Sequence, residues 1–154
     1  MGKEIERKFL VKGEDWRKMG KPMRYVQGYL SCEKERTVRV RLTEEKAFIT
    51  IKGMATASVR HEFEYEIPPE DAEIMLKEMC EKPLIEKNRF IISYGGLVWE
   101  VDEFFGMNRG LITAEVELQD ENQSIDLPPW IEREVTGDPR YLNVNLVKNP
   151  YSTW

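Results

Sequence analysis

Alternation of charged and apolar residues is the feature that most constrains how this chain folds. In the run KEIERKFLV, residues 3–11, every second side chain falls on the same side of an extended strand. Glu4, Glu6 and Lys8 share one side, and the other side is mostly apolar. Similar strand-like runs cover 3–11, 23–33, 36–44, 46–53, 60–68, 84–94, 97–105 and 112–120. Most of their connections are too short for a parallel crossover, which predicts antiparallel neighbours.

Helical patterns interrupt these runs at three places, 14–19, 70–81 and 139–147. The last begins with Asp138 in a capping position and Pro139 in the first turn. An apolar stripe on the second helix is expected to pack on a sheet and consists of Ile74, Met75, Leu76 and Met79. The segment 121–137 is expected to be irregular.

Length and charge limit the class of protein. The 154 residues predict one domain, residues 1–154. The net charge of −5 gives no global attraction to duplex nucleic acid or to a membrane surface. No run is long and apolar enough for a membrane span, and the charged N-terminus argues against a secretory signal, so the cytoplasm is the expected location. The two cysteines and one histidine offer no Cys/His zinc cluster.

Charges are segregated by sign along the strand faces. One side of seven runs carries Glu4, Glu6 and Lys8; Arg39 and Arg41; Lys52; Glu62, Glu64 and Glu66; Lys87 and Arg89; Glu100 and Asp102; and Glu115 and Glu117. For any single strand, a solvated outer face of a sandwich explains such a pattern. A solubilising face usually mixes the signs, however, and two basic residues on one strand face repel unless an anion lies opposite. Taken together, the runs favour a shared polar interior.

A polar interior predicts a mainly β (α+β) fold, an eight-stranded closed antiparallel β-barrel with a charged lumen and a few peripheral helices. The apolar faces then point outward and are covered by the helices, and closure removes the open sheet edges. Carboxylates in a wet lumen suit Mg²⁺ or Mn²⁺, and neighbouring Arg and Lys suit phosphate oxygens. The expected ligand is therefore a metal-bound polyphosphate.

The same residues resemble the signature of a known family. Glu4-Ile5-Glu6-Arg7-Lys8 is similar to the Glu-x-Glu-x-Lys motif of the CYTH superfamily, also called triphosphate tunnel metalloenzymes. Later motifs are similar in the same order, namely Arg39-Val40-Arg41, Lys52, Glu62-Phe63-Glu64, Lys87-Asn88-Arg89, Asp102, Glu115-Val116-Glu117 and the tail from Glu134 to Asp138. The resemblance spans nearly the whole chain and is closest to small bacterial tripolyphosphatases.

The resemblance implies a role for each charged position. Glu4, Glu6 and Glu117 are expected to be the principal metal ligands, with Glu115 beside them. The phosphate chain is expected to bind Lys8, Arg39, Arg41, Lys52, Lys87 and Arg89. Glu62, Glu64 and Asp102 are expected to hold a second metal or the attacking water. Glu4, Glu6 and Lys8 are counted with these last three as catalytic residues.

The leading functional hypothesis is a metal-dependent triphosphatase. It would hydrolyse inorganic tripolyphosphate to pyrophosphate and phosphate, and nucleoside triphosphates less well. The alternatives are a class IV-like adenylyl cyclase, a thiamine triphosphatase and a polyphosphate-binding module without turnover. An RNA 5′-triphosphate end stays open as a substrate, and the oligomeric state is not readable from the chain.

Other motifs add little. No nucleotide-binding glycine motif is present, and no Ser-His or Cys-His pair suggests a nucleophile. Tyr25 and Tyr29 either line the tunnel, stack on a base or simply pack between strands. His61 is one position out of register with the inward face, and the segment 139–147 is placed at one end of the tunnel by position and resemblance.

Overall fold

A computed structural model of the chain describes residues 3–54 and 59–154. Its strands are β1 (Lys3–Val11), β2 (Pro22–Glu33), β3 (Arg36–Leu42), β4 (Ala47–Gly53), β5 (Val59–Ile67), β6 (Ile85–Tyr94), β7 (Leu97–Phe104), β8 (Ile112–Glu117) and β9 (Ile131–Glu134). The first eight correspond to the predicted runs. Every pairing between them is antiparallel.

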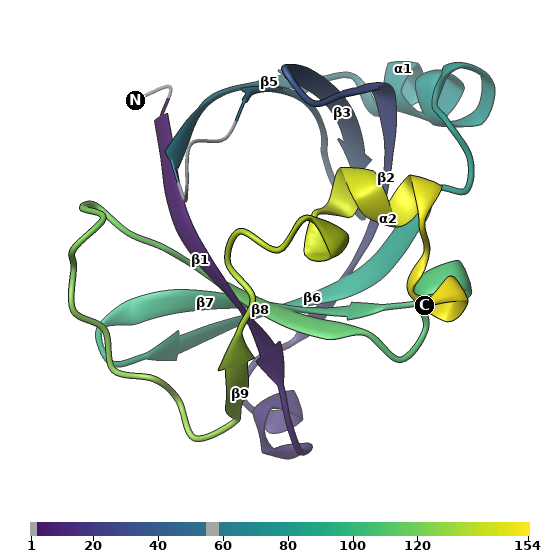
Figure 1. Ribbon diagram of the computed structural model, residues 1–154. Coiled ribbons are helices and arrows are strands. Elements are labelled where there is room, and N and C mark those ends of the chain that lie inside the picture. The colour runs from purple at the N-terminus through teal and green to yellow at the C-terminus, as the bar shows by residue number, and fades with distance from the viewer. Residues whose placement is uncertain (1–2, 55–58) are drawn as a thin grey trace.

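The eight strands close into a ring, which confirms the predicted architecture (Figure 1). The strand order is β5-β4-β3-β2-β6-β7-β8-β1, and β1 returns to pair with β5 through residues 3–5. Further along, β1 leaves β5 and pairs on that edge with β9. Around this ring β8 and β3 are four strands apart in either direction, so they face each other across the interior.

The short strand β9 was not predicted. The segment 121–137 is irregular except for Ile131–Glu134, where four residues are too few to display an alternating pattern. Their pairing depends on the edge of β1 that β5 leaves open beyond Ile5. This strand therefore forms because of a tertiary contact that local sequence does not encode.

Helices appear at the three predicted places, but in shorter pieces. They are η1 (Asp15–Lys18), α1 (Pro69–Ile74) continued by the π-helical turn η2 (Met75–Met79), and η4 (Pro139–Tyr141) followed by α2 (Asn143–Lys148). Asp138 accepts a hydrogen bond from the backbone N–H of Arg140, as the capping prediction requires. Two further turns are η3 (Gly106–Asn108) and η5 (Tyr151–Thr153). No helix in the described ranges is long and apolar enough to cross a membrane.

The predicted apolar stripe of the second helix is wrong in part. Ile74 and Met79 are 54% and 62% exposed, whereas Leu76 is buried. The buried contacts come instead from Ala72, Leu76 and Cys80, which are spaced four residues apart and pack on β2, β3 and β4. The wider π-helical turn at residues 75–79 rotates Met79 out of the position that a regular helix would give it.

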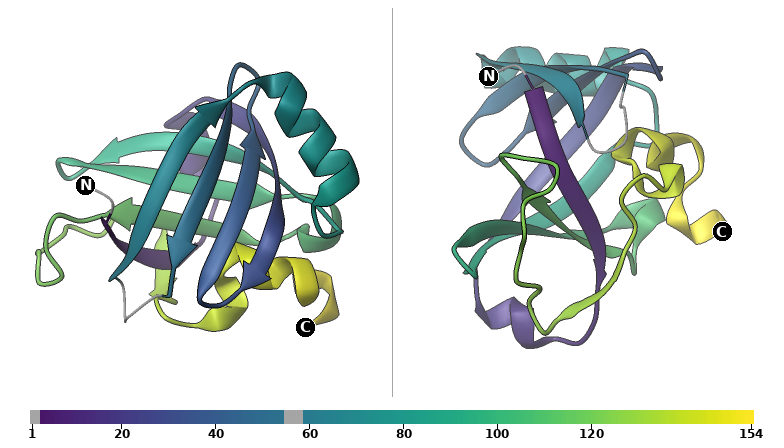
Figure 2. Two further views of the ribbon diagram at one scale, coloured as in Figure 1. Left: turned by 90° about the horizontal axis from the view of Figure 1, so that it is seen from above. Right: turned by 60° about the vertical axis from the view of Figure 1, so that its left-hand side comes forward.

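The outer faces of the ring are covered unevenly (Figure 2). Trp16, Trp99 and Trp130 fill a core on the outer side of β1, β6, β7 and β8, beneath η1 and the segment that leads to β9. The outer face of β5 is not covered in this way, because Phe63 and Tyr65 remain 48% and 59% exposed. The prediction that helices cover the apolar faces therefore holds only for part of the ring.

Candidate active site

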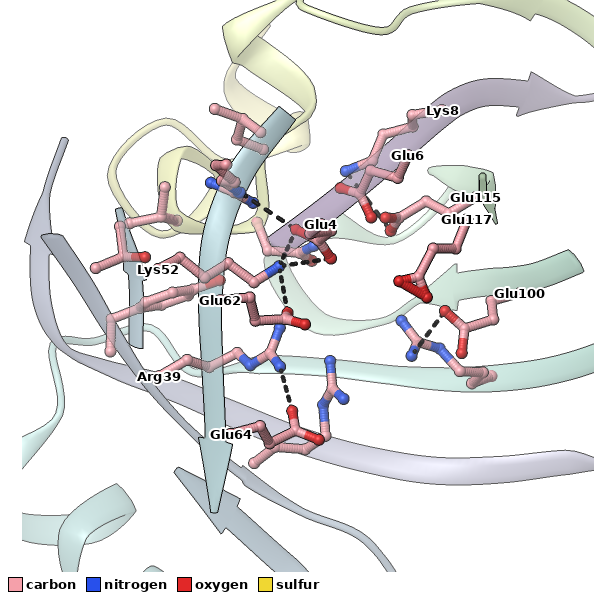
Figure 3. Close-up of a pocket in the computed structure, with 18 residues that line it drawn as sticks. Glu4, Glu6, Lys8, Arg39, Lys52, Glu62, Glu64, Glu100, Glu115 and Glu117 are labelled. Atoms are coloured by element: carbon pink, nitrogen blue, oxygen red, sulfur yellow. Dashed lines mark hydrogen bonds and ion pairs between the residues drawn. The ribbon is translucent and has the colours of Figure 1, made fainter. Parts of the chain in front are cut away.

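The inner face of the ring encloses a charged cavity of about 250 Å³. Figure 3 shows the side chains of β1, β3, β4, β5, β7 and β8 that converge on it. All the site residues predicted from the sequence line it except Lys87 and Asp102. The lining consists of Glu4, Glu6, Lys8, Tyr29, Thr37, Arg39, Arg41, Lys52, Arg60, Glu62, Glu64, Arg89, Glu100, Glu115, Glu117, Leu142, Asn143 and Val144.

Four carboxylates form what we call the acidic wall: Glu6 on β1, Glu115 and Glu117 on β8, and Glu100 on β7. The strand registers place like charges directly opposite each other, with Glu6 facing Glu117 and Glu100 facing Glu115. Opposed like charges destabilise a sheet unless a cation lies near them. The acidic wall is therefore a site where a cation is favoured.

Within the acidic wall, the pKa values of Glu6 and Glu115 are shifted in opposite directions. Burial raises the pKa of Glu6 well above its ordinary value, and the neighbouring Glu115 raises it further by charge and by a hydrogen bond. Glu115 is also buried, but the positive charge of Lys8 holds its pKa well below the usual range. These opposite shifts favour a neutral Glu6 that donates a hydrogen bond to an ionised Glu115. At the wall's more exposed edge, burial and then Glu4 and Glu62 raise the pKa of Glu117.

Lys8 links the acidic wall to the C-terminal segment. Its ammonium donates to the carbonyl oxygen of Tyr141 at 2.9 Å and lies 3.8 Å from the Glu115 carboxylate. Leu142, Asn143 and Val144 follow directly and also line the cavity. In Figure 1, η4 and α2 cross the ring at this end. The C-terminal segment therefore closes part of the cavity, as its position in the sequence predicted.

Glu4 has cationic partners within the protein. Lys52 donates to both of its carboxylate oxygens, at 3.0 and 3.2 Å, and Arg60 donates at 3.3 Å. Burial raises the pKa of Glu4, but the charge of Lys52 and then of Arg60 outweighs it, so the net pKa is lowered. Lys52 also lies 3.2 Å from Glu62. Arg60 had no predicted role, although it precedes Glu62 by two residues and so shares the inward side of β5.

Arg39 and Arg41, the arginine pair of β3, lie across the ring from β8. Arg39 donates to Thr50 at 3.0 Å and to Glu64 at 3.4 Å, but its buried Nε–H has no partner among the described residues. Arg41 makes only a 3.3 Å hydrogen bond to Gln27 and no ion pair within the described part of the chain. Burial, and then the charges of Arg39 and Arg89, lower the pKa of Arg41 to about 9. Arg41 is half-buried, and a partly desolvated guanidinium without a carboxylate favours binding of an anion.

Lys87, Arg89 and Asp102 form an ion-pair network behind the lining, which we call the closed network because each of its charges has a partner within the protein. Arg89 also lies 3.3 Å from Glu100 of the acidic wall. Asp102 accepts one bond from Lys87 at 2.7 Å and two from Arg89 at 2.8 and 2.9 Å. Burial would raise the pKa of Asp102, but Arg89 and Lys87 lower it to about 2. Burial lowers the pKa of Lys87 to about 7 despite Asp102. Arg89 reaches the cavity, whereas Lys87 is fully buried and Asp102 is 1% exposed.

The carboxylate oxygens of the cavity are suitable ligands for a divalent metal ion. Among residues 3–54 and 59–154, no three acidic, histidine or cysteine side chains stand together as a ready-made coordination site. One reason is that these side chains already have partners, since Glu4 forms ion pairs with Lys52 and Arg60 while Glu6 is hydrogen-bonded to Glu115. The acidic wall nevertheless gathers hard oxygen donors whose mutual repulsion a cation would relieve. The fit therefore requires Glu4 and Glu6 to exchange their present partners.

Comparison with known proteins points to the same family as the motifs. The family model of the CYTH domain matches residues 2–151. The chain is 53% identical to an inorganic triphosphatase of Acetivibrio thermocellus over 154 residues, which cover 100% of this chain and 99% of that protein. It is 36% identical to an inorganic triphosphatase of Nitrosomonas europaea, over 93% of this chain and 95% of the relative.

A solved structure agrees in fold. The crystal structure of an inorganic triphosphatase that is 34% identical superposes with a TM-score of 0.64, covering 94% of this chain and 97% of that one.

Proposed function

The chain belongs to the CYTH family, and from that premise we propose that it is a divalent-metal-dependent triphosphatase. Its main substrate is inorganic tripolyphosphate, which it hydrolyses to pyrophosphate and phosphate, and it hydrolyses nucleoside triphosphates less well. Both relatives described above are inorganic triphosphatases. Mg²⁺ and Mn²⁺ are the proposed metals because both prefer carboxylate and phosphate oxygens.

One observation carries this proposal: the four carboxylates of the acidic wall, which have ion pairs only from Lys8 and Arg89 among the described residues, face an arginine that has no anionic partner there. The opposed carboxylates of β8 and its neighbours favour a cation. Arg41 on β3, across the ring, lacks an anion among the described residues. A ligand that satisfies both sides carries a metal ion and a chain of negative charges, which describes a metal-bound triphosphate.

Partner exchange at Glu4 supports the same ligand. In the structure, Lys52 and Arg60 neutralise Glu4. When Glu4 ligates a metal, these two cations lose part of their counter-charge and are freed to bind phosphate oxygens. We therefore propose Arg60 as a phosphate-binding residue beside Lys52, although the sequence motifs did not include it.

The protein's own groups account for binding and orientation. The phosphate chain binds Arg39, Arg41, Lys52, Arg60, Lys8 and Arg89. The carboxylates of Glu4, Glu6, Glu115 and Glu117 would hold the metal, which supplies charge neutralisation at the phosphoryl oxygens when bound. Glu62 and Glu64 remain the proposed holders of the attacking water. Hydrolysis forms a bond from the water oxygen to the terminal phosphorus and breaks the bridging P–O bond, with pyrophosphate as the leaving group.

Asp102 and Lys87 receive a different role from the one the sequence suggested. Both carboxylate oxygens of Asp102 already accept hydrogen bonds from Lys87 and Arg89. Asp102 is therefore unsuited to hold the attacking water. We propose that Asp102 and Lys87 act through Arg89, which they fix at the cavity wall. Arg89 remains the member of this network that touches phosphate.

The composition of the lining favours a substrate without a base. Among the described residues that line the cavity, only Tyr29, Leu142 and Val144 have aromatic or aliphatic side chains, and the others are polar or charged. A nucleotide base normally binds against apolar or aromatic surface. Inorganic tripolyphosphate can therefore use the cavity fully, whereas the base of a nucleotide gains little from it.

Product analysis tests the proposal. Purified protein is incubated with tripolyphosphate, ATP, thiamine triphosphate or an RNA 5′-triphosphate, each with Mg²⁺, Mn²⁺ or a chelator. We expect equimolar pyrophosphate and phosphate from tripolyphosphate, slower release from ATP, and turnover at least 1000-fold lower with chelator, about 4 kcal/mol in activation free energy. Glu117→Gln should lose this activity and the exposed control Glu121→Gln should keep it. Cyclic AMP from ATP, or binding of tripolyphosphate without hydrolysis, would overturn the proposal.

A further inference from the structure

Tyr25 lies between the two strands that carry the proposed phosphate-binding residues Arg41 and Arg89. It belongs to β2, which separates β3 from β6. Its direct partner on β6 is Lys87, and the next residue pair along β2 on the same face joins Gln27 to Arg41 of β3. Side chains on diagonal positions of neighbouring strands are within reach of an aromatic ring. Tyr25 can therefore contact arginines from both adjacent strands.

The ring makes both contacts. The guanidinium carbon of Arg41 lies 5.0 Å from the ring centroid of Tyr25, and that of Arg89 lies 4.9 Å from it. Both distances are within the range at which a cation is attracted to the face of an aromatic ring. Arg41 comes from the strand on one side and Arg89 from the strand on the other. One aromatic side chain therefore contacts two cavity-lining guanidiniums.

Arg41 depends on this contact more than Arg89 does. Asp102 binds Arg89 through two hydrogen bonds. Arg41 has only the long bond to Gln27 and the ring of Tyr25 among the described contacts. The two guanidiniums repel each other, as their mutual effect on the pKa of Arg41 shows. Without the ring, the side chain of Arg41 would be free to turn away from its neighbour.

We propose that Tyr25 is a positioning residue that holds Arg41 at a fixed distance from Arg89, so that both guanidiniums can bind the phosphate chain together. This inference rests on the proposed function, because it takes these arginines to be phosphate ligands. The aromatic ring is the part that acts, and the hydroxyl group is dispensable. Tyr25 is not among the residues that line the cavity, so it acts through the two arginines that it contacts.

The test compares a variant that keeps the ring with variants that remove it. Tyr25→Leu should raise KM for tripolyphosphate about tenfold, with a smaller change in kcat, because binding rather than chemistry loses a preorganised partner. Tyr25→Phe should restore KM to within about threefold of the wild-type value. Tyr65→Leu, at an exposed tyrosine on the outer face of β5, is the matched control and should leave KM unchanged.

A double-mutant cycle assigns the effect to Arg41. Arg41→Ala should weaken binding, and adding Tyr25→Leu to it should cost less than about threefold more, because the partner is already absent. Equal KM values for Tyr25→Leu and Tyr25→Phe, or fully additive losses with Arg41→Ala, would overturn the inference. If Tyr25→Leu does not fold, as judged by its thermal unfolding transition, Tyr25→Met offers a flexible side chain without a ring.

A binding measurement separates this inference from the proposed function. Calorimetric titration of tripolyphosphate should show the same tenfold loss of affinity in Tyr25→Leu and the same recovery in Tyr25→Phe. A wild-type protein that binds tripolyphosphate without hydrolysing it would defeat the proposed activity while leaving the role of Tyr25 supported by these affinities. A wild-type protein that does not bind tripolyphosphate would defeat both.

Discussion

Two regions of the ring interior treat buried charge in opposite ways. In the network of Lys87, Arg89 and Asp102, each charge has a partner within the protein, and the carboxylate accepts three hydrogen bonds. In the acidic wall, like charges face each other across neighbouring strands, and only Glu115 and Glu100 have a cationic partner among the described residues, Lys8 and Arg89. Arg41 has no carboxylate partner in the described part of the chain. The first region contains charged groups that stabilise the fold. The second contains charged groups that are available to bind a ligand.

Glu4 has features of both regions. Its partners Lys52 and Arg60 neutralise it in the structure, so it behaves as a member of a closed network. Its position on β1, two residues before Glu6, also makes it a member of the proposed metal-binding set. Glu4 can therefore exchange Lys52 and Arg60 for the proposed metal ion when the ligand binds.

The largest effect on stability is expected where a closed network is broken. Asp102→Asn leaves Lys87 and Arg89 buried without a carboxylate, which should lower the free energy of unfolding by about 3–5 kcal/mol. Urea denaturation measures this loss, with Asp120→Asn at an exposed position as the control. A loss below about 1 kcal/mol would show that the ion pairs of Asp102 with Lys87 and Arg89 do not stabilise the fold.

A smaller effect, on activity alone, is expected at Arg41. Arg41→Ala should lower kcat/KM for tripolyphosphate about 30-fold, or about 2 kcal/mol, since a charge-assisted bond to phosphate is lost. The free energy of unfolding should stay the same or rise, because the guanidinium has no carboxylate among its described contacts. Arg36→Ala on the outer side of the same strand is the matched control. A marked loss of stability in Arg41→Ala alone would place Arg41 with the closed network.

Acid should weaken the closed network gradually. The pKa of Asp102 is about 2 in the fold against an ordinary value of 3.8, so its ionisation stabilises the protein above about pH 4. This stabilisation, about 2 kcal/mol, is lost as the pH falls from about 4 towards 2. Unfolding curves across this range should show the wild type approaching Asp102→Asn in stability. A constant gap between the two proteins would contradict the assignment.

The sequence was sufficient to predict which side of each strand faces the cavity, because a period of two depends only on local geometry. It therefore identified Glu4, Glu6, Lys8 and the paired motifs of the later strands as lining residues, as the structure confirms. Alternation says nothing about depth. Lys87 and Asp102 lie behind the lining because Ile85, Phe104 and Tyr141 fill that end of the ring, a packing arrangement that no single strand reveals.

Tertiary contacts explain the remaining differences. Arg60 shares the inward side of β5 with Glu62, but the family motifs do not include it, and its contact with Glu4 is a tertiary one. The cavity contacts of Leu142, Asn143 and Val144 depend on how the C-terminal segment crosses the ring. The sequence left three roles open for Tyr25, namely lining the tunnel, stacking on a base or packing between strands. Its contacts with Arg41 and Arg89, which support the proposed positioning role, are apparent only in the structure.

The most direct test of the contrast between the two regions is Glu6→Gln. Burial and the neighbouring Glu115 raise the pKa of Glu6 well above its ordinary value, which favours the neutral acid, so a neutral amide that can also donate a hydrogen bond should replace it with little strain. At pH 6, the free energy of unfolding without metal should remain within about 0.5 kcal/mol of the wild-type value, while tripolyphosphate hydrolysis is lost. A loss of stability as large as that expected for Asp102→Asn, or retention of hydrolysis, would contradict the account.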